Sequence, residues 1–363
     1  MRSLENKARL ARVAFVGVPC HVNAVRKIGF LSGFLKKKQG ERDFDYPLWP
    51  SRILTIGLFC RENFSREALA RFLSERFDTD WDEIRKIDCS RGKFTVYTDK
   101  GKQDVPISET KKVARNCCAV CPDLSSEFAD ISVGNMGSPD GYNTLIVRTE
   151  LGRRVVQSAI ASGVIEVGRE IDTGELEKQE KNKAKAARKE HEERKKEGKV
   201  ALFQETLTKE NLDEFLDAAG RNDFDDLEKD VIFAGACVYC GACSVVCPED
   251  NLFFEDGRPY RKEKCPENCG ACYAVCPRTH SLVSYLAGET KEIYSARATS
   301  IDYAAQDGGV ATALLCHAVE REFVDAVTTI KGERALLTNE KGDIKKGAGT
   351  KHFFVPVALL LRR

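Results

Sequence analysis

The 363-residue sequence predicts an α/β protein with a mixed sheet, joined to a small α+β domain that is rich in cysteine. Two observations support this fold class. Short apolar runs alternate with stretches of helical periodicity, which is typical of layered α/β architecture. The chain also holds 15 cysteines, most of them in close groups.

Each expected element rests on a local pattern. Ser65 is a helix cap, and the apolar residues that follow it, at 69, 72, 73 and 77, fall on one face. The 93–98 stretch alternates and predicts an edge strand. Helices are also expected at 154–162, closed by Gly163, and from Gly308 to 319. Further strands are expected at 12–17, 53–59, 129–133, 143–148 and 324–330.

Composition narrows the partners and the compartment. With 57 Lys and Arg against 56 Asp and Glu, neither nucleic acid nor an anionic membrane is expected as a partner. The first 13 residues lack a signal-peptide core, and the longest apolar run, 352–361, is too short to span a bilayer. So many cysteines in such a chain favour metal or redox chemistry over disulfides, and we expect a cytoplasmic, oxygen-poor setting.

Eight cysteines form two runs, CVYCGACSVVCP at 237–248 and CPENCGACYAVCP at 265–277. This is the spacing of two-cluster bacterial ferredoxins, in which the fourth cysteine of each run ligates the other cluster. The second run has one extra residue between its first two cysteines. A pair of zinc knuckles is the alternative. The rule predicts two [4Fe–4S] ligand sets, namely Cys237, Cys240, Cys243 and Cys276, and Cys265, Cys269, Cys272 and Cys247.

Four more cysteines follow expected strands or a turn. Cys20 ends GVPC, Cys60 ends GLFC, and Cys118 and Cys121 form a CxxC pair. Ligands gather at the carboxyl ends of strands in open α/β sheets, so these thiols could hold a third cluster. Buried free cysteines of the core are the alternative.

The sequence resembles the beta subunit family of coenzyme F420-reducing hydrogenase and F420 dehydrogenases. The resemblance lies in VAFVGVPCHVNAVRK at 13–27, IGLFCRENFS at 56–65, CCAVCPDLSSEFADISVGNMGSPDGYNTLIVRTELG at 117–152, the runs at 237–277, and QDGGVATALL at 306–315.

The resemblance implies an iron–sulfur flavoprotein subunit. It would exchange hydride with coenzyme F420 through FAD and pass single electrons to clusters of a hydrogenase, a formate dehydrogenase or a similar complex. The family assigns Cys20, Cys60, Cys118 and Cys121 to the cluster beside the flavin. Cys117 is then a neighbour, and Cys89 and Cys316 are core thiols. Two alternatives remain, a ferredoxin-dependent reductase of chlorophyll-type pigments and a subunit that only carries electrons.

The glycine-rich segments suit a flavin site in such a protein, although no catalytic residue is identified. Gly308 and Gly309 precede a helix, whose N-terminal N–H groups suit a pyrophosphate. The loop after 129–133 is polar and flexible. Arg148 could pair with a phosphate, or be an exposed charge on its strand. His21 could tune the cluster or be structural. The expected cofactor contacts are Gly134, Asn135, Gly137, Ser138, Asn143, Arg148, Gly308, Gly309 and Thr312, with Asp140 and Gly141 in the same loop.

The segments stand in an unusual order. Residues 1–175 correspond to the C-terminal half of the family domain and 283–363 to its N-terminal half, with the ferredoxin-like domain at 226–282 between them. The 176–225 segment is expected to be a charged linker, since 178–199 has ten Lys or Arg and five Glu. For 178–199, a solvated helix or a linker is favoured over a nucleic-acid patch. The end, 347–363, resembles the family segment that leads into VAFVGVPC. A circular permutation, a tandem fusion with halves swapped between copies of a homo-oligomer, and a misassembled reading frame all fit this order.

Overall fold

The structure is a computed structural model, and it describes most but not all of the chain. The described residues are 12–38, 53–90, 92–199, 206–207, 222–255, 258–267, 269–279, 281–282, 290–332, 334–349, 355 and 360. Most of the apolar run at 352–361 and most of the segment 200–225 lie outside them. No helix among the described residues has both the length and the apolar character needed to cross a bilayer.

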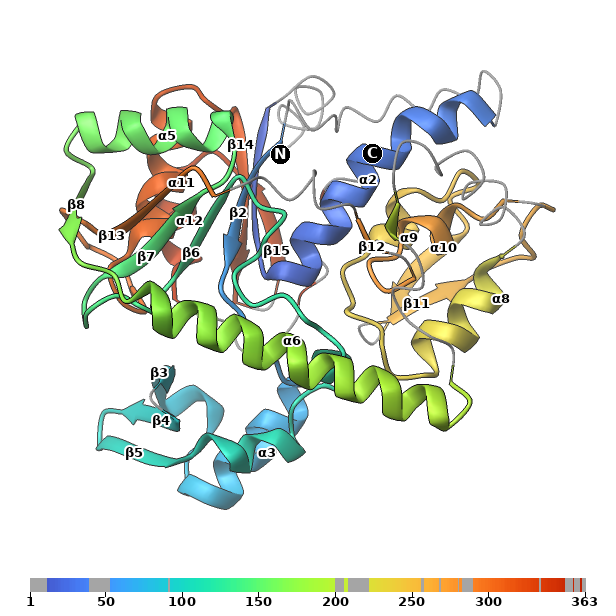
Figure 1. Cartoon of the computed structure of the whole chain (residues 1–363), viewed down its shortest axis with the longest axis horizontal. Helices are drawn as coiled ribbons and strands as arrows, with labels where there is room; N and C mark the ends of the chain where they lie inside the picture. Colours follow the sequence, from blue (N-terminus) through green and yellow to red (C-terminus); the bar gives the residue numbers. More distant parts are fainter. Residues whose placement is uncertain are drawn as a thin grey trace.

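A mixed sheet forms the centre of the larger body (Figure 1). In the described part of the chain it has eight strands in the order β15-β14-β1-β2-β6-β7-β13-β8. The strands from β14 to β6 run parallel, and the others pair antiparallel with their neighbours. The bounds are β1 Val13–Gly17, β2 Ile53–Leu58, β6 Ile131–Gly134, β7 Asn143–Val147, β8 Ile165–Arg169, β13 Glu292–Ala298, β14 Ala326–Lys331 and β15 Arg334–Thr338.

Both halves of the sequence contribute to this one sheet. Strand β14 pairs with β1, Val13 lying opposite Ala326. Strand β13 lies between β7 and β8, with Glu292 opposite Val147. The mixed α/β class is therefore confirmed, and the two halves come together within one chain.

Helices cover both faces of the sheet. Helices α5 (Glu150–Ala161) and α11 (Val310–Glu320) pack their buried residues with the strands in one apolar core. Thr149 caps α5 by accepting from the N–H of Gly152. The small helix α12 (Lys341–Lys346) lies beside them. On the other face, α2 (Pro19–Lys38) packs in a core that also contains residues of the cysteine-rich module.

A separate three-stranded sheet follows β2. It consists of β3 (Ile84–Ser90), β4 (Lys93–Thr98) and β5 (Gly101–Pro106), and helix α3 (Arg66–Phe77) packs against it. The Ser65 cap is confirmed, since its side chain accepts from the N–H of Ala68, and the predicted apolar face of α3 is buried. The edge-strand prediction for 93–98 is wrong. Strand β4 is central because both β3 and β5 pair with it.

The cysteine-rich module comprises the described residues between 222 and 282. It contains short helices and a two-stranded hairpin, and Figure 1 places it beside α2, away from the sheet. Its elements are α8 Phe224–Leu227, the π-helical turn η4 Glu228–Ile232, α9 Ala242–Val245, β10 Leu252–Glu255, β11 Arg258–Arg261, α10 Ala271–Val275 and β12 Ser281–Leu282. The remaining short elements among the described residues are η2 Trp81–Glu83, η3 Ile107–Lys112, α4 Asn116–Ala119 and β9 Thr206–Leu207, which pairs with β12.

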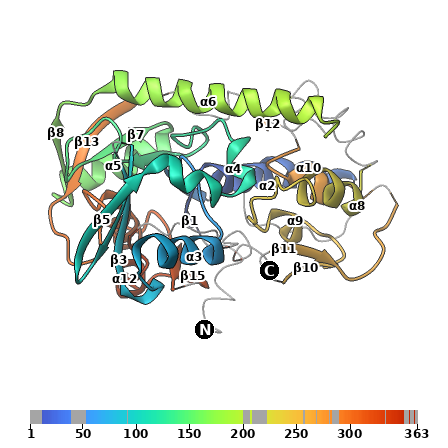
Figure 2. The ribbon, with the colours of Figure 1, turned by 90° about the horizontal axis from the view of Figure 1, so that it is seen from below.

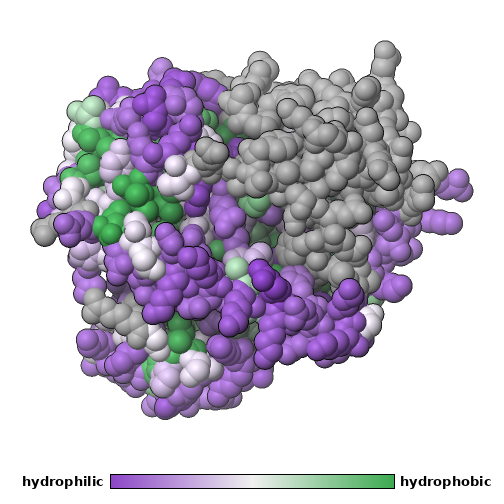
Figure 3. All heavy atoms as spheres, in the orientation of Figure 1, coloured by the Kyte–Doolittle hydropathy of each residue, from purple (hydrophilic) through white to green (hydrophobic). Residues whose placement is uncertain are grey.

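Helix α6 (Thr173–Lys196) runs from the sheet to the cysteine-rich module (Figures 1 and 2). The surface over it is hydrophilic (Figure 3). Its inner side is nevertheless buried, at Leu176, Lys183, Ala187 and Arg194. These positions are seven, four and seven residues apart, so they lie on one helical face. The expected helix is present, but the expectation of a solvated linker is wrong for this part, because one face of α6 is packed against both bodies.

Candidate metal centres and the adjoining glycine loops

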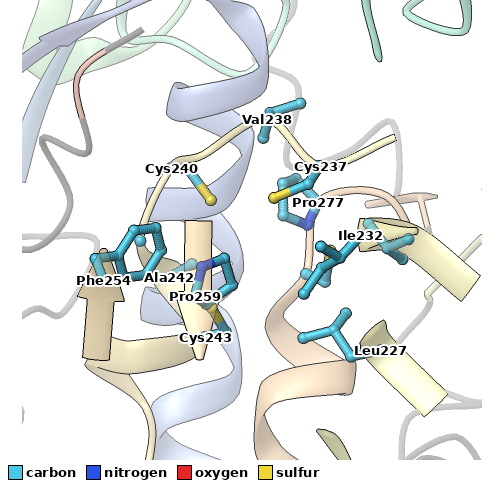
Figure 4. A pocket seen from close by; sticks show the side chains of 13 residues that line it. Leu227, Ile232, Cys237, Val238, Cys240, Ala242, Cys243, Phe254, Pro259 and Pro277 are labelled. Carbon is cyan, nitrogen blue, oxygen red and sulfur yellow. The ribbon is translucent and has the colours of Figure 1, made fainter. Parts of the chain in front are cut away.

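Four cysteines of the cysteine-rich module line one pocket (Figure 4). We call Cys237, Cys240, Cys243 and Cys276 the first thiol group. Figure 4 shows Cys237 and Cys240 pointing inward from one loop, with Cys243 deeper in α9. Gly241 has φ +87°, the left-handed region, which allows the chain to turn between Cys240 and Cys243. Apolar side chains, among them Leu227, Ile232 and Phe254, complete the wall.

The second thiol group lies beside the first. Burial is the main cause that raises the pKa of Cys272 well above its usual value, and the charges of neighbouring thiols raise it further. The backbone N–H of Asn251 donates to Cys247 Sγ at 3.2 Å. The members of this second group are Cys247, Cys265, Cys269 and Cys272. Each group thus takes its fourth thiol from the other run, which is the crossed grouping that the spacing predicts.

A third thiol group forms where the sheet meets α2. Cys20 lies in the first turn of α2, and Cys60 directly follows β2. Burial raises the pKa of Cys60 to about 12, and nearby thiols add to the rise. Burial likewise raises the pKa of Cys20, with further contributions from the other thiols of the group. The structure therefore brings together the four cysteines Cys20, Cys60, Cys118 and Cys121.

Two features single out Cys118 within this group. The side-chain hydrogen bond with Cys117 lowers the pKa of Cys118 to about 7, while burial opposes the change. The backbone N–H of Asn63 also donates to Cys118 Sγ at 3.2 Å. Hydrogen bonds that favour the thiolate suit a metal ligand, because thiolate is the form that binds metal.

Two buried cations accompany the third group, and sequence reasoning missed both. Lys183 of α6 is 7% exposed, and its Nζ donates to the carbonyl oxygens of Cys60 and Asp123. Burial alone would lower the pKa of Lys183, but the neighbouring thiols raise it overall. Arg278 is 2% exposed, and its Nη2 donates to the carbonyl of Cys117 at 2.9 Å. Neither cation has a local sequence signal, although Arg278 directly follows the Cys-Pro end of the second run.

His21 is a structural link between the bodies. Its Nε2 lies 3.0 Å from the carbonyl oxygen of Val238, which stands between two cysteines of the first thiol group. Burial lowers the pKa of His21 to about 4, against the effect of this hydrogen bond. Nearby, the Nζ of the buried Lys27 donates to the carbonyl of Cys276 at 2.5 Å. Both side chains of α2 thus hold the cysteine-rich module in place.

The donor sets fit iron–sulfur clusters. Within the described part of the chain, no group of three or more His, Cys, Asp or Glu side chains stands close enough to hold a single metal ion. A [4Fe–4S] cubane takes four cysteine thiolates, one for each iron corner. Four cysteines around one apolar pocket, as in the first group, match that demand.

The two predicted glycine loops meet at Asn143. Its Nδ2 donates to the carbonyl of Gly134 at 3.3 Å, and its Oδ1 accepts from the N–H of Val310 at 3.2 Å. A second hydrogen bond joins the loops through the side chains of Asn135 and Asp307. The loop after β6 and the N-terminus of α11 therefore form one continuous surface.

Small residues and local hydrogen bonds shape these loops. Gly309 has φ +71° at the cap of α11. Gly137 has φ +88°, and a Cβ there would stand 2.9 Å from a backbone oxygen. A Cβ on Gly308 would likewise stand 2.9 Å from a backbone oxygen. Ser138 Oγ lies 2.7 Å from the Thr144 hydroxyl. Thr312 lies half-buried in the first turn of α11, Gly141 has φ +81°, and Asp140 is exposed.

Arg148 is placed differently from the expectation of an exposed strand charge. It is 7% exposed, and its guanidinium donates to three hydroxyl groups. These belong to Ser132 at 3.1 Å, Ser125 at 2.9 Å and Thr290 at 3.3 Å. Arg148 thus braces the segment that follows Cys121, and a phosphate contact stays a prediction.

The three-stranded sheet closes on the second glycine loop, a contact that the sequence did not indicate. Gln306 Nε2 donates to the carbonyl of Ile87 at 2.9 Å. In return, Lys86 Nζ donates to the carbonyl of Gln306 at 2.6 Å. Strand β3 therefore borders the site formed by the two loops.

Comparison with known proteins matches both halves of the sequence to one family. Residues 10–173 match the family of the C terminus of the coenzyme F420 hydrogenase/dehydrogenase beta subunit, and residues 293–362 match the family of the N terminus of the same beta subunit. The part that matches the C terminus comes first in this chain, so the order is permuted. The two matches lie on the two halves of the sequence that share the sheet.

Several relatives are similar over part of their length. A coenzyme F420 hydrogenase subunit beta from Methanococcus voltae is 37% identical over 158 residues, 43% of this chain and 52% of the relative. A coenzyme F420-dependent sulfite reductase from Methanocaldococcus jannaschii is 33% identical over 196 residues, 53% of this chain and 30% of the relative. The chain thus spans about half or less of these two proteins. A chain of the F420-reducing [NiFe] hydrogenase complex from Methanosarcina barkeri is 35% identical, with a TM-score of 0.44, covering 51% of this chain and 62% of that chain.

Proposed function

Because the chain belongs to the coenzyme F420 hydrogenase/dehydrogenase beta subunit family, we propose that it transfers electrons between coenzyme F420 and iron–sulfur clusters of an F420-linked redox complex. The named relatives are subunits or enzymes of F420-linked oxidation and reduction. In this proposal the three thiol groups hold three [4Fe–4S] clusters, and the glycine loops hold FAD. The partner would be a hydrogenase, a formate dehydrogenase or a comparable complex.

One observation carries the proposal: the third thiol group and both glycine loops lie at the same edge of the sheet. Strands β1, β2 and β6 are parallel, so Cys20, Cys60 and the loop after Gly134 follow their carboxyl ends at one edge. Strand β13 runs in the direction of β6, since each is antiparallel to β7, and the Gly308 loop follows its end. This edge is where open α/β sheets bind ligands.

The chain's own residues have distinct parts in the proposal. A bound flavin would supply the ability to exchange hydride on one side and single electrons on the other. The N–H groups of Ala311 and Thr312, in the first turn of α11, would face its pyrophosphate, since that of Val310 donates to Asn143. Asn143 would fix the two loops to each other. Lys183 and Arg278 would counter the negative charge of the thiolates in the third group.

The cysteine-rich module supports the second half of the proposal. Its crossed thiol groups and the pocket of the first group support a ferredoxin-like domain with two clusters, over residues 226–282. Residues 1–175 and 283–363 would together form the flavin and third-cluster domain. Contacts of His21 and Lys27 with the first group would then keep the clusters of the two domains close together.

The test is anaerobic purification with iron, sulfide and flavin measured per chain, followed by mixing with reduced F420. Three cubanes predict about twelve iron atoms, and reduced F420 should bleach the flavin absorbance. Cys60→Ser should lower the iron content, whereas Cys316→Ser, at a half-buried thiol in α11, should leave it unchanged. Zinc or no metal would contradict the proposal. Full iron without flavin would favour a subunit that only carries electrons.

A further inference from the structure

Arg278 lies where the first and third thiol groups meet. It follows Cys276 by two residues, so its backbone belongs to the loop that supplies a thiol to the first group. Its side chain reaches the other body, where Nη2 donates to the carbonyl of Cys117 at 2.9 Å. Cys117 is the direct neighbour of Cys118 in the third group. One buried side chain therefore connects the backbones that carry ligands of two groups.

The charge of Arg278 acts on both groups. Its guanidinium favours the thiolate of Cys20 in the third group. It also favours the thiolate of Cys237 in the first group, where its effect is smaller than those of burial and of the hydrogen bond from the Tyr239 backbone. Burial alone would lower the pKa of Arg278, yet the thiols of the third group raise it overall. Arginine stays protonated in proteins, so this positive charge is a fixed feature of the junction.

Other cations also lie around the junction. Lys27 donates to the carbonyl of Cys276 in the first group. Lys183 donates to the carbonyl of Cys60 in the third. Arg115 stacks over the ring of Tyr239, with its guanidinium carbon 4.2 Å from the ring centroid, on the side of the first group. Arg278 differs from Lys27 and Lys183 because its backbone lies two residues from a ligand of one group while its hydrogen bond goes to the neighbour of a ligand of the other. It differs from Arg115 because its contact is a hydrogen bond to that backbone rather than a ring contact.

We propose that Arg278 is a positioning residue that couples the first and third metal centres. It holds the turn of Cys117 against the loop after Cys276, and it supplies one positive charge that both centres share. This inference rests on the proposed function. A reduced cluster carries one more negative charge than an oxidised one, so a nearby buried cation stabilises the reduced state. Removal of the charge should lower the reduction potential of both centres together.

The experiment is a potentiometric titration of the full-length, anaerobically purified protein, followed by electron paramagnetic resonance. The signals are assigned with Cys276→Ser and Cys60→Ser. Arg278→Gln keeps a donor for the carbonyl of Cys117 but removes the charge, and Arg278→Lys keeps the charge. The matched control is Arg194→Gln, because Arg194 is 6% exposed and its Nη2 also donates to a backbone carbonyl, that of Ala234, at 2.7 Å.

We expect Arg278→Gln to keep its iron and to shift both centres to lower potential. The expected size is at least tenfold in the ratio of oxidised to reduced protein at a given potential, which is 59 mV for a one-electron couple. Arg278→Lys should shift them less, and Arg194→Gln should stay within threefold of wild type. If Arg278→Gln loses iron, Arg278→Lys is measured instead. A shift of both centres to lower potential by less than tenfold in that variant still supports the proposal.

Several results would overturn the inference. Unchanged potentials in Arg278→Gln, or a shift confined to one centre, would show that the charge is not shared. Loss of iron from both Arg278 variants would make the residue a requirement for metal binding rather than for coupling. These results leave the proposed function intact, because it is judged on the wild-type protein. Wild-type protein without clusters would instead refute the proposed function, and this inference with it.

Discussion

The packing of α6 across the two bodies depends on Lys183, and Lys183→Met tests this. The ammonium group donates to two backbone carbonyls, of Cys60 and of Asp123, the latter at 2.7 Å. Methionine keeps most of the apolar stem and removes every donor. A hydrogen bond to a charged group contributes about 1.5–3 kcal/mol. Two such bonds stabilise the docking of α6 against the sheet. The cost of taking the ammonium out of water offsets part of this gain, which leaves a net contribution of about 3 kcal/mol.

Hydrogen exchange of the α6 backbone amides measures this docking. A loss of about 3 kcal/mol should make opening of the helix about 100-fold more frequent. The matched control lies on the same helix: Lys178 is exposed and pairs with Glu175 at 3.7 Å. Lys178→Met should change exchange by about twofold at most, since exposed ion pairs contribute little.

Exchange in Lys183→Met that stays within threefold of wild type would refute the reasoning. It would mean that the apolar contacts of Leu176 and Ala187 hold α6 without the ammonium. Equal acceleration in Lys178→Met would also refute it, because the effect would then follow from loss of charge anywhere on the helix. Iron content, measured in parallel, shows whether the third thiol group depends on the same contact.

Three further predictions concern single positions. Asp130→Asn should lower the free energy of unfolding, measured by urea titration, by about 3–5 kcal/mol. The reason is that Arg26, which lies 3.0 Å from the Asp130 carboxylate in a buried pair, loses its counter-charge. Unchanged stability would contradict this prediction. Gly57→Ala should lower the melting temperature through a loss of more than about 1 kcal/mol, since the new Cβ would stand 2.1 Å from a buried hydroxyl, whereas Gly342→Ala, with open space around it, should not. Cys276→Ser should lower iron content by about a third, without the loss of flavin expected if the third centre were affected.

Local patterns in the sequence predicted the parts of the fold that depend on neighbours along the chain. The Ser65 cap and the buried face of α3 follow from spacing within one helix. The two thiol groups of the cysteine-rich module follow from spacing within two short runs, because each run supplies three ligands to one cluster and its fourth cysteine to the other. The parallel central strands read as short apolar runs, as strands buried on both faces do.

Contacts between distant segments could not be predicted in this way. Strand β4 looked like an edge strand because its partner β5, Gly101–Pro106, is mostly exposed and has no apolar alternation. Lys183 lies in a segment whose composition suggests surface charge, and Arg278 directly follows the second cysteine run. Their burial depends on thiols that come from other parts of the chain, at 20, 60 and 118–121. One sequence alone carries no record of which charge faces which distant thiol.

The permuted order gives the cysteine-rich module two attachments to the sheet. The chain leaves the sheet after β8, runs through α6 and the module, and returns as β13, which pairs directly with β8. The β1 strand, near the start, lies between β14 and β2, and the buried Val355 packs in the same core as Val13. The sheet therefore needs no fixed order of its two halves, as expected when segments that are distant in sequence lie close in the fold.

A module tethered at both ends also loses less entropy on docking than one tethered at a single end, because its accessible volume is already restricted. Helix α6 further restricts the volume that the module can occupy, since a 24-residue helix is a semi-rigid connection. The two covalent attachments keep the module near the sheet. Contacts such as those of His21 and Lys27 then need only to fix its orientation. For this reason, substitutions at these two positions should alter the alignment of the first and third thiol groups before they release the module. Rates of electron transfer between the two centres are thus expected to be more sensitive to them than global stability is.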